Sequence, residues 1–276
     1  MSSLATAVNA PRSGALGARL AVLWQLQVLS LRMLARERAV WRIVAAAAAA
    51  LVAARVLAFV SLGGQGETLR DVGLAIVRLA VFAYALVTTC RLGTSSEDAG
   101  CRRMLAASPL PLELYVFGRY LGLLGGLCLA LPTLGLVLLG LLWLGDSGVD
   151  LTTPAGLAGE GLLGAVLLAF GLLFGLALRP AAAILALTTL FGLALASGPL
   201  QGLMDGIGIG SRAGLVLLGL IPAPETAPPL SSPAIAGSDA LMLDRLGLTA
   251  LQSLGYVLGC LALACVGCLS RGRLRV

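Results

Sequence analysis

The chain has 276 residues, of which 59% are hydrophobic and only 12% are charged, and its formal net charge is +6. Soluble domains carry roughly 25% charged residues, so this chain has too few charges to cover a water-facing surface and is predicted to be an integral membrane protein. It contains no histidine, and all 19 of its basic residues are arginine. The first absence excludes the commonest general base and most zinc sites, and the second excludes a P-loop ATPase within this chain.

The N-terminal part is predicted to lie outside the hydrocarbon core of the membrane. Residues 1–16 are rich in Ser, Pro, Gly and Ala without periodicity, and we expect a disordered cytoplasmic tail. Residues 17–40 are expected to form an interfacial helix, because Gln25, Arg32 and Arg36 fall on one stripe while most of the leucines lie away from it. The alternative is that these residues only lead into the first membrane span.

Six apolar runs follow, each near the roughly 20 residues that cross a bilayer. We predict spans at 41–62, 71–93, 116–144, 158–178, 181–200 and 246–270. The runs are continuous and do not alternate as membrane β-strands do, so the predicted fold class is all-α, a polytopic membrane protein with six transmembrane helices. Residues 17–276 are expected to form this single domain.

The positions of the arginines predict the orientation of the spans. Six spans place both termini on one side of the membrane, and most arginines fall on that side: Arg12, Arg19, Arg32, Arg36, Arg38, Arg42, Arg91, Arg102, Arg103, Arg119, Arg179, Arg271, Arg273 and Arg275. The opposite side has Arg70, Arg212 and Arg245, and two more lie inside spans. Because cytoplasmic loops are enriched in arginine, both termini are predicted to be cytoplasmic. This clustering accounts for the positive charge without nucleic acid, which is not an expected partner.

A charged segment, SSEDAGCRRMLAASPLP at 95–111, separates the second and third predicted spans. Capping-box residues at its start and prolines at its end predict a short amphipathic helix followed by a sharp break. Met104 and Leu105 beside a charged rim are typical of a docking surface for a soluble partner. The alternative is an ordinary solvated loop.

The longest connection, residues 201–245, is predicted to lie outside the cell. It contains a second apolar piece, Ala213–Ile221, which is too short to span a bilayer. Several prolines follow that piece and prevent a regular helix. We therefore expect a re-entrant or interface-lying segment before the last span.

The stretch EDAGCRRMLAASPLPLELYVFGRYLG, from Glu97 through Gly122, resembles the type-2 ABC exporter permease family. The resemblance lies in the acidic start, the leucine-containing helix, the Ser-Pro-Leu turn and the Gly-Arg-Tyr-x-Gly helix start. The preceding run DVGLAIVRLAVFAYAL, at 71–86, is similar to the second span of the copper-processing, nitrous-oxide-reductase-maturation-like branch of that family. The predicted order of elements along the whole chain is similar as well.

The resemblance implies a permease subunit that couples ATP hydrolysis in a separate subunit to export across the bacterial cytoplasmic membrane. It implies that the segment at 94–112 is the coupling helix, which contacts the ATPase through Glu97, Asp98, Arg102, Arg103, Met104 and Leu105. The implied partners are an ATP-binding cassette subunit, which holds ATP and Mg, and a second copy of the chain or a homologous permease. The chain itself is expected to bind no cofactor or metal and to have no catalytic site.

Few polar residues lie inside the predicted spans, and charges buried in a membrane are costly and commonly functional. Glu160 is expected to pair with Arg78 or Arg55, and contact between Arg78 and an anionic substrate is an alternative. The resemblance places a transport pathway between spans two and five, where threonines are candidates, although threonines in membrane helices more often hydrogen-bond their own backbone or a neighbour. These are Thr88, Thr89, Thr188 and Thr189.

Three cysteines on the last predicted span, Cys260, Cys265 and Cys268, are interpreted as small apolar packing residues. A soft-metal relay is the alternative interpretation. Asp146 and Asp150 have the spacing of a magnesium–diphosphate motif, but they lie in a short external loop without a second such motif, so an enzyme is not predicted.

Two other functions compete with that of an ABC permease. A stand-alone secondary transporter or channel normally shows internal repeats or paired broken helices, and none stands out in this sequence. A permease-like scaffold that transmits ATPase motion to a periplasmic partner needs the same coupling helix as an exporter.

Overall fold

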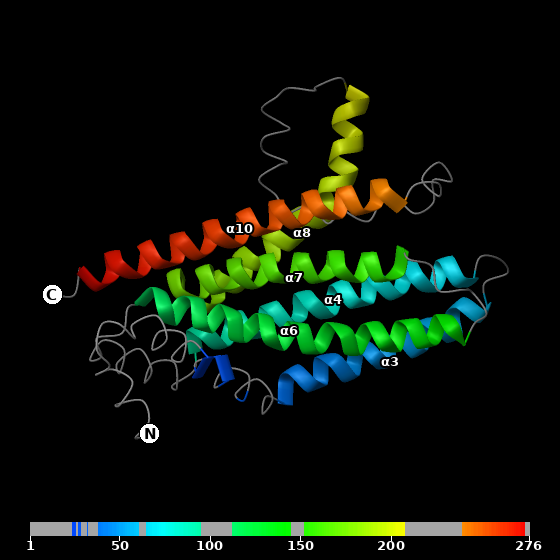
Figure 1. Cartoon of the computed structure of the whole chain (residues 1–276), viewed down its shortest axis with the longest axis horizontal. Helices are drawn as coiled ribbons and strands as arrows, with labels where there is room; N and C mark the ends of the chain where they lie inside the picture. The colour runs from blue at the N-terminus through cyan, green and yellow to red at the C-terminus, as the bar shows by residue number, and fades with distance from the viewer. Residues whose placement is uncertain are drawn as a thin grey trace.

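The computed structural model describes residues 24, 25, 27, 28, 32, 38–60, 65–94, 112–144, 152–207 and 239–273. These residues are almost entirely helical, and no strand occurs among them. The long helices (Figure 1) are α3 (Arg38–Val60), α4 (Gln65–Thr94), α6 (Leu112–Trp143), α7 (Thr152–Ala177), α8 (Pro180–Ile207) and α10 (Asp239–Arg273). The predicted all-α fold class is confirmed for this part of the chain.

Five stretches of helix are long and apolar enough to cross a membrane: Arg38–Phe59, Gly66–Arg91, Leu114–Trp143, Thr153–Ala177 and Thr249–Val266. The apolar stretch of α8, Pro180–Ala196, is shorter. By length and composition, these are the helices of a multi-pass membrane protein.

Helices α3, α4, α6 and α7 lie side by side and run back and forth along the long axis, and α10 runs in the same direction as α7 (Figure 1). The start of α3, the end of α4, the start of α6 and the end of α10 therefore lie toward the same end of the bundle. We call this the arginine-rich end, and it is defined by Arg38, Arg42, Arg91, Arg119 and Arg179.

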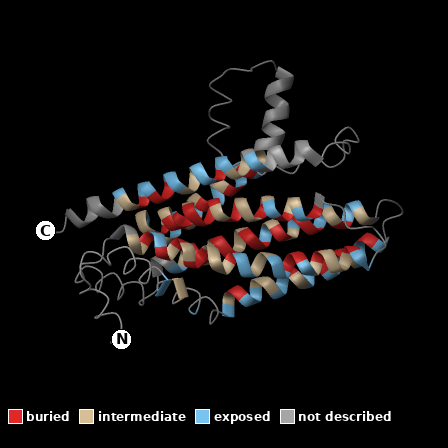
Figure 2. Ribbon diagram, in the orientation of Figure 1, coloured by how far each residue is buried: buried red, intermediate tan, exposed pale blue. Residues whose placement is uncertain are grey.

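Helices α4 and α7 form the centre of the bundle. Half of the apolar window of each is buried, against 22% for α3. Helix α7 contacts α4, α6, α8 and α10, and the buried residues concentrate on the sides that these helices turn toward one another (Figure 2). Leucines such as Leu138, Leu167 and Leu187 fill the interior.

Most of the helices extend beyond the spans predicted from hydropathy. Helix α4 begins at Gln65 instead of residue 71, and α7 begins at Thr152 instead of residue 158. Helix α8 continues to Ile207 instead of ending at residue 200, and α10 begins at Asp239 instead of residue 246. Hydropathy falls at the edge of the apolar region, but a helix can continue through polar and small residues. A helix can therefore extend beyond the part that is apolar enough to lie in the membrane. An aspartate at the start of α10 also suits the positive end of the helix dipole.

Several predicted segments fall outside the described residues. They are the N-terminal tail at 1–16, the charged segment at 95–111 and the region at 208–238 that contains the expected re-entrant piece. Of the expected interfacial helix at 17–40, the structure describes only residues 24, 25, 27, 28, 32 and 38–40, and these are helical.

Candidate functional site

The interior of the bundle contains a buried ion pair between α4 and α7. The Arg78 guanidinium donates hydrogen bonds from Nε and Nη2 to the same oxygen, Oε1 of Glu160, at 2.8 and 2.6 Å. The side chain of Glu160 is 5% exposed and that of Arg78 is 24% exposed. Of the two pairings expected for Glu160, the structure therefore has the one with Arg78.

The second carboxylate oxygen of Glu160 remains available to another donor. Oε2 is buried and accepts no hydrogen bond from any residue that the structure describes. Arg55, the other expected partner, lies on α3. Among the described residues it has no ion-pair partner, and its buried Nη1 has no hydrogen-bond acceptor. The pair thus neutralises the charge of Glu160 but leaves one acceptor position open inside the bundle.

Glycines of α7 bring this helix close to α4 around the ion pair. A Cβ added to Gly156 would come within 3.0 Å of Leu74, and one added to Gly164 would come within 2.7 Å of Val81. One added to Gly171 would collide with the hydroxyl of Thr89. In each of these three contacts and in the ion pair, the residue of α7 follows its partner on α4 by nearly the same number of positions in the sequence. This constant spacing shows that α4 and α7 run in the same direction in a constant register.

The four candidate pathway threonines lie in two different environments. Thr88 and Thr89 on α4 are buried, and their hydroxyls donate to backbone carbonyls one turn earlier, with Thr89 donating to Ala85 at 2.7 Å. Thr188 and Thr189 on α8 are exposed and donate to carbonyls of their own helix in the same way. All four hydroxyls are thus satisfied locally, and the structure does not gather them into one polar cluster.

Two tyrosine hydroxyls that the sequence did not single out tie neighbouring helices together. Tyr84 on α4 donates to the carbonyl of Leu123 on α6 at 2.9 Å, and Tyr120 on α6 donates to the carbonyl of Ala165 on α7 at 3.2 Å. Both rings are buried. A tyrosine inside an apolar span is itself a signal for such a bond, because its hydroxyl needs a partner away from water.

The residues expected to contact an ATPase, Glu97, Asp98, Arg102, Arg103, Met104 and Leu105, lie outside the described residues. Of the three cysteines on α10, Cys260 is buried and Cys265 is partly buried, whereas the side chain of Cys268 is outside the described part. Among the described residues, no group of three or more histidine, cysteine or acidic side chains is placed to hold a metal ion.

No protein-family model matches this chain, and the search of curated proteins gives no significant match. The function is therefore argued from the residues and their arrangement.

Proposed function

We propose that this chain is the membrane-spanning permease subunit of an ABC exporter in the bacterial cytoplasmic membrane. A separate ATP-binding cassette subunit binds ATP and Mg, and two copies of the chain, or the chain and a homologous permease, enclose the pathway. In this proposal all six long helices cross the membrane and both termini are cytoplasmic. The stretch at 17–40 lies in the interface, and the region before α10 is re-entrant.

The observation that carries the proposal is the place of the connection between α4 and α6. Helix α4 ends at Thr94 and α6 begins at Leu112, both at the arginine-rich end of the bundle (Figure 1). The connection holds two acids, two arginines and the apolar pair Met104 and Leu105. An apolar pair within a charged segment at the cytoplasmic end of a membrane bundle suits a soluble subunit better than it suits lipid.

The packing of α4 supports a mechanical role for that connection. Helix α4 continues directly from the connection into the centre of the bundle, where the ion pair and the close contacts at the glycines fix it to α7. A displacement of residues 95–111 by an ATPase then moves α4 and α7 as one unit. Alternating access requires a permease to transmit such a movement from the cytoplasmic side to the helices that line the pathway.

The exposed threonines of α8 are the better candidates for the pathway. Thr188 and Thr189 lie on a face that no described residue covers, and in the proposed dimer this face lines the space between the two permeases. Thr88 and Thr89 are packed between helices within one chain, so a solute reaches them only if α4 and α7 separate.

Replacing Met104 and Leu105 together by aspartate tests the proposal. We expect the variant to insert into the membrane normally but to purify without a P-loop ATPase and without ATP turnover. The matched control is Leu144→Asp, which makes the same chemical change at an exposed position at the opposite end of α6 and should leave both unchanged. An ATPase that stays bound and active in the double variant would remove the coupling role of this segment.

A further inference from the structure

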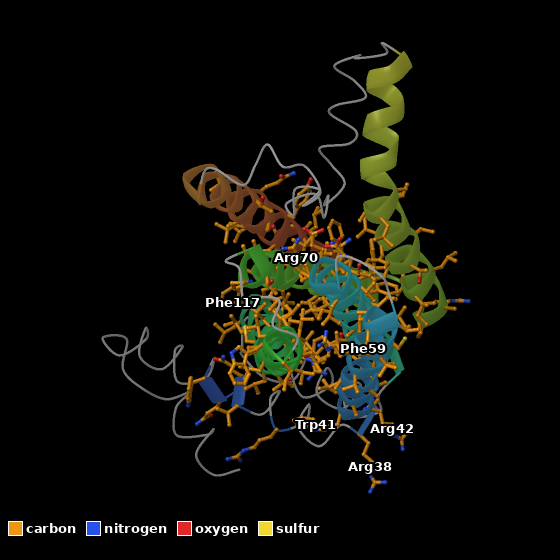
Figure 3. The ribbon with its side chains drawn as sticks, turned by 90° about the vertical axis from the view of Figure 1, so that its right-hand side faces the viewer. Arg38, Trp41, Arg42, Phe59, Arg70 and Phe117 are labelled. Atoms are coloured by element: carbon orange, nitrogen blue, oxygen red, sulfur yellow. The ribbon has the colours of Figure 1, made fainter. Side chains whose placement is uncertain are left out.

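The first turn of α3 presents two exposed arginines on one face of the helix. Arg38 and Arg42 are four residues apart, and neither makes a hydrogen bond or ion pair with a described residue. Trp41, between them in sequence, is 56% exposed. The side chains of Arg38 and Arg42 extend outward from the end of α3 at the lower side of the view in Figure 3.

An apolar stripe of small residues continues from these arginines along the same side of the helix. Ala45, Ala46, Ala49 and Ala53 are exposed, and the 65% exposed Val56 follows one turn later. An acyl chain can lie close to the backbone along such a stripe, because alanine side chains are short. The surface is therefore positively charged at the start of α3 and apolar farther along the helix. This arrangement is complementary to a lipid that has an anionic headgroup and an apolar chain.

The positive charges of Arg38 and Arg42 favour an anionic lipid over a second copy of the chain on this face of α3. In a symmetric pair of parallel copies joined through this face, Arg38 and Arg42 of one copy would meet the same residues of the other at the same depth, so like charges would repel. A phosphate provides acceptors for both guanidinium groups, and tryptophan favours the headgroup level of a bilayer.

We propose that Arg38, Trp41 and Arg42 bind the headgroup of an anionic phospholipid whose acyl chain lies along Ala45 and Ala49. The lipid comes from the leaflet at the arginine-rich end. This site requires only that α3 crosses the membrane, so it stands independently of the proposed exporter function.

Quenching of Trp41 fluorescence by brominated lipids tests the site. The chain has three tryptophans, and the other two, Trp24 and Trp143, are exposed and can be replaced by phenylalanine. The single-tryptophan protein is reconstituted in phosphatidylcholine vesicles that contain a small fraction of brominated phosphatidylglycerol or brominated phosphatidylcholine. We expect stronger quenching by the glycerol lipid, with the preference falling about fivefold for each arginine changed to glutamine, or roughly 1 kcal/mol each.

Two control variants distinguish the loss of the positive charges at this site from a general effect of substitution on the protein. Arg38→Lys with Arg42→Lys keeps both charges and should keep the preference, and Arg179→Gln removes an exposed arginine at the same end but away from Trp41 and should also keep it. Equal quenching by the two lipids, or a preference that survives in the double glutamine variant, would overturn the proposal. Protection of Trp41 from both lipids would overturn it too, because it would assign the face to another protein chain.

Discussion

Arg78 and Glu160 form the ion pair inside the bundle. Each charge in the hydrocarbon region is costly alone, and the two hydrogen bonds to Glu160 Oε1 make the pair tolerable. The pair joins α4 to α7, the two helices whose apolar windows are the most buried among the five membrane-length stretches. Its contribution should therefore appear as a large penalty when one partner is removed.

Replacing Glu160 by alanine leaves the Arg78 guanidinium unpaired inside the bundle. We expect the free energy of unfolding to fall by about 3–5 kcal/mol, toward the lower end because Arg78 is partly exposed. The double replacement Arg78→Met with Glu160→Leu removes both charges and should lie closer to the wild type. Denaturation of the purified protein in detergent micelles measures these differences.

The control for this pair is Asp71→Ala. The Asp71 carboxylate lies 3.9 Å from Arg70 and is 65% exposed, so its loss should change stability by less than about 1 kcal/mol. If Glu160→Ala were as stable as Asp71→Ala, the buried pair would have no structural role.

At the residue scale, the sequence predicted the ion pair of Glu160 but not its geometry. Charges inside apolar runs are few, so Glu160 and Arg78 could be recognised as a pair, with Arg55 as the rival partner. The backbone bonds of the threonines were foreseen as the alternative to a pathway role. The free Oε2 of Glu160 and the tyrosine bonds depend on side-chain directions across helices, which no spacing along one helix determines.

At the scale of elements, helices α4 and α7 pack closely against each other on both sides of the ion pair. Gly156, Gly164 and Gly171 of α7 receive side chains of α4 at regular intervals. Small residues allow helix backbones to approach, and the resulting van der Waals packing is one of the forces that hold helices together in lipid. The register of the two helices should therefore be sensitive to a single added methyl group.

Gly171→Ala tests this packing. The new Cβ would collide with Thr89 Oγ1, which is held by its bond to the carbonyl of Ala85, and we expect a loss of about 1–3 kcal/mol in unfolding free energy. Thr89→Ala in the same chain should recover most of the loss by removing the obstructing hydroxyl. The measurement is again denaturation in detergent.

Gly192→Ala is the matched control for that substitution. Gly192 is exposed on α8 with no neighbour within 4 Å of an added Cβ, so alanine should be neutral or stabilising by up to about 1 kcal/mol. A Gly171→Ala variant as stable as Gly192→Ala would show that α4 and α7 are not locked at this point.

The helices themselves could be predicted from the sequence because continuous apolar runs in a membrane protein must satisfy their backbone internally. Each predicted run lies largely within an observed helix, whereas the ends of α4, α7, α8 and α10 were missed, since hydropathy marks the membrane core and not the end of a helix. Which helices pack at the centre could not be read from hydropathy, because α6, α7 and α8 are similarly apolar. The number of glycines does not distinguish them either, because α6 and α7 contain six each.

At the scale of the whole molecule, four helix ends lie toward the same end of the bundle (Figure 1). The start of α3 and the end of α10 lie toward the arginine-rich end, where the connection between α4 and α6 begins and ends (Figure 1). If all six helices cross the membrane, as we propose, the positive-inside rule predicts that this end is cytoplasmic. The proposed ATPase contact and the proposed lipid site then face the same side of the membrane.

We propose that this chain works with a separate ATPase, and the subunit composition of its native complex tests this proposal. Native mass spectrometry of the complex, released gently from source membranes, counts the subunits. The account predicts two permeases, either two copies of this chain or one with a homologous permease, with two P-loop ATPase subunits that are lost when Met104 and Leu105 are replaced by aspartate. A wild-type chain that is released intact and alone, without any P-loop ATPase, would contradict the account.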